Sequence, residues 1–137
     1  MAYNPSDLTD IRLLTKALAF AASKHRHQRR KDEHASPYIN HPIQLMDVLT
    51  GIGKVEDIPT LVAALLHDTI EDTHTNYEEL KAYFGNEIAD IVMEVSEDPA
   101  LSKEDRRQQF VTRAPHFSRK AKLVKLADLI ANVNDVL

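Results

Sequence analysis

The stretch LVAALLHDTIED, residues 61–72, constrains the fold of this chain more than any other segment. Its first six residues are apolar on every side of a helix, so we expect this helix to lie in the middle of the hydrophobic core. The apolar run leads directly into His67 and Asp68, and Glu71 and Asp72 follow one turn later. Burying such groups is costly unless they are paired or bind a metal ion. The stretch therefore predicts a central helix with polar chemistry at its end.

The rest of the chain predicts further helices separated by short breaks. The sequence has only three Gly and no Trp, and long stretches lack turn residues, which favours helices over a β fold with many turns. Thr75 with Glu78 forms a capping box, and Ser102 marks the start of a later helix. No segment gives a convincing strand. We expect an all-α fold, a bundle of about seven helices.

The length of 137 residues predicts a single domain spanning residues 1–137, with a core large enough to fold alone. The final helix, RKAKLVKLADLIANVNDVL, reaches residue 137 without a cap or a stop signal. Two explanations stay open at this point, a natural end of the chain and a shortened domain.

The composition excludes several classes of function. A net charge of −4 argues against broad nucleic-acid binding, which usually needs a basic surface. The absence of Cys excludes disulfides, thiolate zinc sites and a cysteine nucleophile. The sequence shows no signal peptide and no apolar run close to the ~18 residues of a membrane helix. We expect a cytoplasmic protein without a nucleic-acid or membrane partner, and the sequence leaves its oligomeric state open.

The polar end of the central helix has two interpretations. Positions three and four apart share a helix face, so one continuous helix would present an imidazole and three carboxylates together. A divalent cation would relieve the repulsion among those carboxylates. Alternatively, the helix ends in an acidic surface loop, and His67 is a hydrogen-bonded core residue.

Two residues are too few to hold a metal, so further ligands must come from elsewhere in the chain. His41 opens its helix directly before PIQLM, and Asp128 lies inside LVKLADLIANV. Taken alone, His41 is explained as a helix cap and Asp128 as a solvated carboxylate. Together with His67 and Asp68 they supply two imidazoles and two carboxylates, a set that suits Mn²⁺, Fe²⁺, Zn²⁺ or Co²⁺ better than Ca²⁺.

A lone His, an adjacent His-Asp pair and a distant Asp, all on predicted helices, resemble the pattern of HD-domain metal-dependent phosphohydrolases. Three segments, RRKDEHASPYINHP, AALLHDTIEDT and AKLVKLADLIANV, resemble the hydrolase domain of RelA/SpoT proteins. The similarity is greatest to the small stand-alone alarmone hydrolases, which include the metazoan SpoT homologues, and it covers nearly the whole chain. The resemblance implies an all-helical, Mn²⁺-dependent enzyme that removes the 3′-pyrophosphate from (p)ppGpp and leaves GDP or GTP.

The resemblance also implies roles for particular residues. The implied metal ligands are His41, His67, Asp68 and Asp128. The implied catalytic pair is Glu71 and Asp72, just outside the metal ligands, where either carboxylate could orient the attacking water and accept its proton. The implied substrate contacts are Arg30, Lys31, Lys103 and Asn132. Arg30 and Lys31 belong to a basic cluster, residues 24–32, which alone is also explained as a solvated helix end.

The chain departs from the family pattern after its last expected ligand. Leu129 stands where the family usually has Arg or Lys, and Ala131 stands where it usually has an aromatic residue or His. The family domain also normally continues into further helices that help to close the nucleotide pocket. These departures leave the expected metal ligands intact and concern the binding of substrate.

Three functions follow as hypotheses. The leading one is hydrolysis of (p)ppGpp to GDP or GTP and pyrophosphate. The second is a phosphatase of the same fold that acts on NADPH or another nucleotide. The third is a non-catalytic alarmone-binding regulatory domain, and the presence of both Glu71 and Asp72 argues against it, because a pure binding domain has no need for them.

Overall fold

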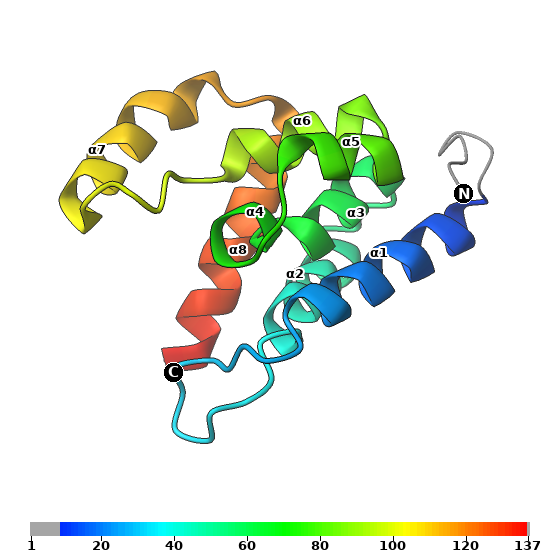
Figure 1. The fold of residues 1–137 in the computed structure, drawn as a ribbon, viewed down its shortest axis with the longest axis horizontal. Helices are drawn as coiled ribbons and strands as arrows, with labels where there is room; N and C mark the ends of the chain where they lie inside the picture. The colour runs from blue at the N-terminus through cyan, green and yellow to red at the C-terminus, as the bar shows by residue number, and fades with distance from the viewer. Residues whose placement is uncertain (1–8, 137) are drawn as a thin grey trace.

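The computed structural model describes residues 9–136, which form eight α-helices and one 3-10 helix (Figure 1). The elements are α1 (Asp10–Lys24), α2 (Asn40–Gly51), α3 (Ile58–Leu66), α4 (Thr69–Asp72), α5 (Tyr77–Phe84), α6 (Asn86–Val95), α7 (Lys103–Arg113), η2 (Ala114–His116) and α8 (Arg119–Val136). Among these described residues the chain forms no strand, only an isolated bridge between Arg29 and Pro37. The predicted all-α bundle of about seven helices is confirmed, with α4 as one short additional turn.

The centre of the fold is α3, as the apolar run predicts. Every residue from Thr60 to Leu66 is buried. The helix packs against α1, α2, α6 and α8, and Figure 1 shows it among them. Its first turn is capped by Asp57, whose carboxylate accepts a hydrogen bond from the Thr60 amide at 3.2 Å. The end of α3 is therefore fixed in the core by packing on several sides.

The chain leaves the helical path at His67 and Asp68. The expectation of one continuous helix through Asp72 is wrong, because α3 ends at Leu66 and α4 begins at Thr69. At this point a side chain, and not only the backbone, donates to a carbonyl group of the helix end: the Thr69 hydroxyl donates to Leu66 O at 2.8 Å. The His-Asp pair consequently lies in a turn between two helices, and not on one helix face.

The predicted helix starts differ in their outcome. Ser102 caps α7 by accepting from the Asp105 amide at 3.1 Å, as predicted. The N-cap of α5 is Asn76, and not the predicted Thr75. The Thr75 hydroxyl instead lies 2.7 Å from the Thr73 hydroxyl. Asn76 accepts from the Glu79 amide at 2.9 Å, so the side chain next to Thr75 in the sequence takes the capping role.

Helix α7 lies at the outer edge of the fold (Figure 1). None of its eleven residues, all within the described part of the chain, is buried. It is attached near its C-terminal end, where the ring of Phe110 packs on Phe117 with centroids 6.3 Å apart. The sequence explains this exposure, because KEDRRQQFVTR has little apolar surface to bury.

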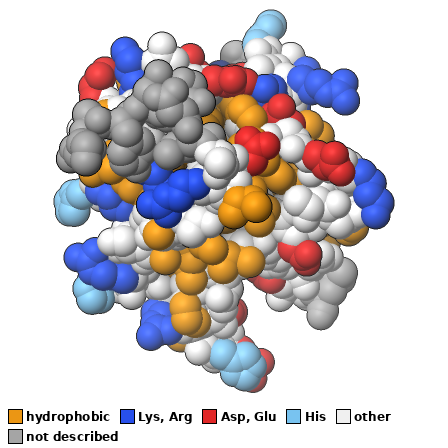
Figure 2. Space-filling view, turned by 90° about the vertical axis from the view of Figure 1, so that its right-hand side faces the viewer, with side chains coloured by type: hydrophobic (Ala, Val, Ile, Leu, Met, Phe, Trp, Pro, Cys, Tyr) orange, Lys and Arg blue, Asp and Glu red, His pale blue; other side chains and the backbone are white. Residues whose placement is uncertain are grey.

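The face of the molecule on the right-hand side of Figure 1 carries apolar side chains in its centre, with charged side chains of both signs around them (Figure 2). Exposed apolar residues of α1, the helix on that side in Figure 1, include Ile11 and Leu18.

No helix within residues 9–136 is long and apolar enough to cross a bilayer.

Candidate active site

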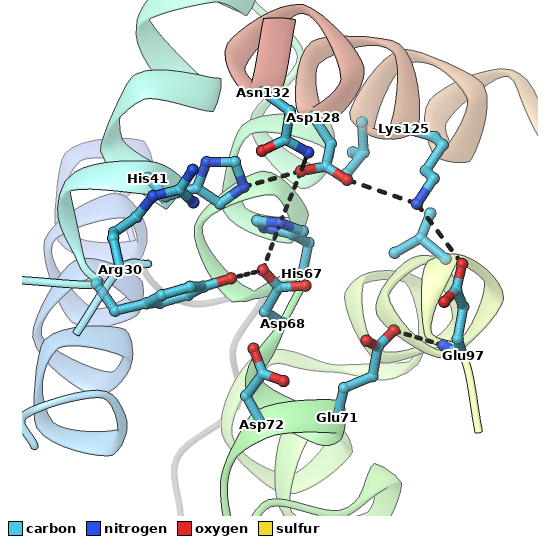
Figure 3. Close-up of a pocket in the computed structure, with 13 residues that line it drawn as sticks. Arg30, His41, His67, Asp68, Glu71, Asp72, Glu97, Lys125, Asp128 and Asn132 are labelled. Atoms are coloured by element: carbon cyan, nitrogen blue, oxygen red, sulfur yellow. Dashed lines mark hydrogen bonds and ion pairs between the residues drawn. The ribbon is translucent and has the colours of Figure 1, made fainter. Parts of the chain in front are cut away.

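A pocket of about 270 Å³ opens between the end of α3, α4 and α8 (Figure 3). Its lining residues are Arg30, Tyr38, His41, His67, Asp68, Glu71, Asp72, Val95, Glu97, Val124, Lys125, Asp128 and Asn132. Eight of these thirteen are residues that the sequence predicts for the site. The pocket thus brings together side chains from segments that lie far apart in the sequence.

Three of the expected ligands form a tight cluster at the base of the pocket. One ligand atom from each of His41, His67 and Asp128 lies within 4.8 Å of the others. Asp128 Oδ1 is 2.8 Å from His41 Nε2 and 3.5 Å from His67 Nε2. Helix α2 provides His41, the end of α3 provides His67, and α8 provides Asp128, so packing of these three helices positions the cluster.

His67 has one ring nitrogen whose role is determined by the backbone. Its Nδ1 lies 2.8 Å from Ala64 O, and a carbonyl only accepts, so Nδ1 carries a proton and Nε2 faces the pocket. Burial lowers the pKa of His67, but the carboxylates of Asp68 and Asp128 outweigh it and hold this pKa well above its usual value. In other words, this corner of the pocket favours a positive charge beside the two carboxylates.

Asp68 lies at the edge of the cluster and has a partner that the sequence did not indicate. Its Oδ2 is 2.9 Å from His67 Nε2, and it accepts a hydrogen bond from the Tyr38 hydroxyl. Burial raises the pKa of Asp68, but the neighbouring His67 and these hydrogen bonds lower it by more, so the net shift of this pKa is downward. Asp68 is therefore an ionised carboxylate held from two sides.

The chemistry of this cluster fits a divalent transition metal. Two imidazoles and two carboxylates provide the mixed nitrogen and oxygen ligands that such ions prefer. The Nδ1 hydrogen bond of His67 leaves its Nε2 toward the carboxylates, the arrangement found for metal-bound histidines. A cation placed among these side chains would also replace the proton that the carboxylates favour on His67.

The expected catalytic pair lies on α4 and faces the same pocket (Figure 3). Glu71 accepts a hydrogen bond from the backbone amide of Glu97 at 2.5 Å, and burial raises the pKa of Glu71 to about 7. Asp72 accepts from Gln28 Nε2 at 3.3 Å, and burial raises the pKa of Asp72 as well. A carboxyl group with a raised pKa is suited to exchange a proton near neutral pH.

The four predicted substrate contacts are not all in this pocket. Arg30 and Asn132 line it. Arg30 pairs with Asp135 at 2.5 Å, and Asn132 donates to Asp128 Oδ1 at 3.3 Å. Lys31 and Lys103 are exposed and are not among the described residues that line the pocket.

Sequence reasoning missed three polar residues of the pocket: Tyr38, Glu97 and Lys125. Lys125 lies 3.5 Å from Asp128 Oδ2 and 3.9 Å from Glu97 Oε1. A signal for it existed, because Lys125 precedes Asp128 by three positions and therefore shares its helix face. Leu129, at the position of a usual cation, is 46% exposed and lies outside the lining. Glu97 follows α6 in an irregular segment, so no local pattern marks it.

Comparison with known proteins gives consistent matches. The family model described as HD domain matches residues 17–136. The chain is 48% identical over 128 residues to guanosine-3′,5′-bis(diphosphate) 3′-pyrophosphohydrolase MESH1 of Xenopus tropicalis, covering 93% of this chain and 72% of that protein. It is 50% identical over 123 residues to the human protein of the same name, covering 90% of this chain and 69% of that protein.

A solved structure gives the same relationship in three dimensions. It is described as a metazoan ortholog of SpoT that hydrolyzes ppGpp and plays a role in starvation responses. It matches with a TM-score of 0.87 and 40% identity, over 90% of this chain and 69% of that one.

Proposed function

The chain belongs to the HD-domain family, within the group that includes the MESH1 proteins, and on this premise we propose that it is a metal-dependent (p)ppGpp 3′-pyrophosphohydrolase. The reaction adds water across the bond between the 3′ oxygen and its pyrophosphate. Pyrophosphate leaves, and GDP or GTP with a free 3′ hydroxyl remains. The names of the relatives support this substrate, and the group of His, Asp and Glu side chains in one pocket supports the reaction class.

The observation that carries the proposal is the position of Glu71 and Asp72 relative to the His-Asp cluster. Both lie on the turn of helix that follows His67 and Asp68, and both line the same pocket. A binding site for an anionic nucleotide gains nothing from two more carboxylates that line it, since they would repel its phosphates. A hydrolase needs such groups to orient water and accept a proton.

We assign the metal to His41, His67, Asp68 and Asp128, with Mn²⁺ as the preferred ion. Such an ion supplies a water of lowered pKa and stabilises negative charge on the phosphate. Asp128 lies within the long helix α8, and the His67 ring is oriented by its hydrogen bond to the Ala64 carbonyl. This fixed arrangement keeps the ligands in place before substrate arrives.

The carboxylates of α4 handle the proton in this mechanism. Glu71, oriented by the Glu97 amide, accepts a proton from the attacking water. Asp72, oriented by the Gln28 amide, holds that water toward the 3′ phosphate. Neither Glu71 nor Asp72 is assigned as a metal ligand, and neither is held by one, so either carboxylate can be removed by mutation without removing a ligand.

Cations at the pocket balance the charge of the substrate. Arg30 and Lys125 line it, and each can bind phosphate oxygens once it leaves its present carboxylate partner. Asn132, on α8 beside Asp128, is placed to contact the nucleotide. We retain Lys31 and Lys103 as proposed substrate contacts outside the described lining of the pocket.

Product analysis tests the function directly. The purified protein is incubated with (p)ppGpp or with NADPH at matched concentrations, with added Mn²⁺ and with EDTA, and products are separated by chromatography. We expect pyrophosphate and GDP or GTP from (p)ppGpp, faster than orthophosphate from NADPH, and neither product with EDTA. Release of orthophosphate from NADPH with no pyrophosphate from (p)ppGpp would favour the nucleotide phosphatase instead.

A further inference from the structure

His25 is a buried residue next to the pocket that the proposed mechanism does not use. It follows α1 and is 2% exposed, and it is not one of the residues that line the pocket. Its Nδ1 lies 2.7 Å from Gln28 Oε1, while its Nε2 is buried without a hydrogen-bond partner among residues 9–136. An amide oxygen only accepts, so the contact with Gln28 places the ring proton on Nδ1.

The contacts of Gln28 with His25 and Asp72 together fit one orientation of its side-chain amide. With Oε1 directed to His25, the NH₂ group of Gln28 points away from it, and Nε2 lies 3.3 Å from Asp72 Oδ2. The reversed amide would set its oxygen against the Asp72 carboxylate and its NH₂ group against the Nδ1 proton. The contact with Asp72 would be repulsive whatever the tautomer of His25, and an Nδ1–H ring on His25 reinforces the amide orientation that donates to Asp72.

The backbone holds these groups in the same place. The backbone N–H of Gln28 donates to the carbonyl oxygen of His25 at 2.9 Å. The backbone N–H of Tyr38 donates to the carbonyl oxygen of Gln28 at 3.0 Å. The ring of His25 also packs on the ring of Tyr38, with centroids 4.8 Å apart. Tyr38 in turn donates its hydroxyl to Asp68. His25 thus contacts Gln28, which donates to Asp72, and Tyr38, which donates to Asp68.

We propose that His25 and Gln28 form a positioning pair that fixes the Asp72 carboxylate for hydrolysis, an inference that rests on the proposed function. Asp72 has a side chain that can rotate, and it is near Asp68, another negative charge. A donor directed at one of its oxygens keeps the other available to the pocket. His25 acts through Gln28 and does not touch the substrate, so its effect is on turnover and not on binding.

Kinetics of Gln28→Ala, alone and combined with Asp72→Ala, test the pair. Gln28→Ala is expected to lower kcat roughly 10- to 100-fold, as loss of an outer orienting partner does, with KM and metal content unchanged. In the Asp72→Ala background the same change should have little further effect, because its target is gone. An equal loss in both backgrounds would overturn the proposal. Gln109→Ala, a Gln on the exposed face of α7, is the matched control.

His25→Phe tests the upstream member, since it keeps a ring against Tyr38 and removes the Nδ1 donor. It should lower kcat to a similar extent as Gln28→Ala, and the two changes together should cost no more than one. Full turnover in His25→Phe, with a thermal unfolding midpoint close to that of the parent, would remove His25 from the pair.

A measurement independent of activity separates this proposal from the proposed function. Nitrogen-15 NMR of the His25 ring reports its tautomer, and we expect the Nδ1–H form in the parent and loss of that preference in Gln28→Ala. An Nε2–H ring in the parent, or an unchanged ring in the variant, would contradict the pair. If the parent protein fails to cleave (p)ppGpp, the proposed function is wrong, and the NMR result still decides whether His25 orients Gln28.

Discussion

The two sides of the pocket are held in place by different means. On one side, α2, α3 and α8 bring His41, His67 and Asp128 together, and the two histidines are only 3% and 5% exposed. On the other side, Glu71 depends on the amide of Glu97, in the segment that leads from α6 toward α7. Helix α7 buries none of its described residues, whereas α3 buries every residue from Thr60 onward.

The second side relies on hydrogen bonds where the first relies on packing. Arg113, in the last turn of α7, donates to Glu94 O at 2.6 Å and to Ser96 O at 3.3 Å. These bonds fix the backbone immediately before Glu97, whose amide orients Glu71. We therefore expect metal binding to be insensitive to α7, and turnover to depend on it through the contacts from Arg113 to Glu97.

The largest expected effect comes from a ligand on the packed side. Asp128→Ala should abolish retention of Mn²⁺ and reduce hydrolysis by more than the roughly 10²–10⁴-fold that a general base contributes. Elemental analysis after dialysis, together with the turnover rate, checks both effects. Undiminished metal content would remove Asp128 from the site. Asp47→Ala, an exposed Asp on α2, is the control.

Removing the catalytic carboxylate should separate the two sides. Glu71→Ala is expected to retain metal and fold while kcat falls roughly 10²–10⁴-fold, because only proton transfer is lost. Metal content, circular dichroism and kcat are measured on the same preparation. Near-parental kcat would contradict the role assigned to Glu71, and loss of metal would place Glu71 among the ligands.

Shortening a buried side chain of the central helix α3 should lower the stability of the fold. Leu65 is 1% exposed within α3, and Leu65→Ala is expected to lower the free energy of unfolding by about 2–5 kcal/mol through lost burial and a cavity. Urea unfolding followed by circular dichroism measures this change. A loss below about 1 kcal/mol would mean that α3 is not the packed centre that its burial indicates.

The link from α7 to the pocket should give a smaller effect. Arg113→Ala removes the two bonds to the backbone before Glu97, and we expect kcat to fall about five-fold, the equivalent of one hydrogen bond of ~1 kcal/mol. Metal content should stay unchanged. Arg107→Ala, a more exposed Arg of the same helix, serves as the control. Parental kcat in Arg113→Ala would show that Glu97 holds its position without α7.

The smallest effect is expected on the surface of α7. Val111 is 63% exposed, so Val111→Ala should change the free energy of unfolding by no more than about 0.5 kcal/mol. Urea unfolding under the conditions used for Leu65→Ala gives the direct comparison. A loss as large as that of Leu65→Ala would mean that α7 is covered in solution.

Much of the architecture follows from local patterns in the sequence. The apolar run of residues 61–66 predicts the buried central helix, and caps such as Ser102 mark helix starts. His41 and Asp128 were identifiable because each is a polar residue within an otherwise apolar helix segment. These inferences rest on hydrophobic burial and helix periodicity, which depend on residues close together in the chain.

Only the tertiary structure decided how the polar residues meet. It placed His67 and Asp68 in a turn, gave Asp68 the Tyr38 hydroxyl as partner, and set the Glu97 amide against Glu71. It also left Lys103 outside the pocket that Lys125 lines. The sequence determined that this chain is all-α and marked its His and Asp residues at apolar helix segments as candidate ligands. Which of them share hydrogen bonds was decided by packing, because those partners are far apart in the chain and meet only when the helices dock.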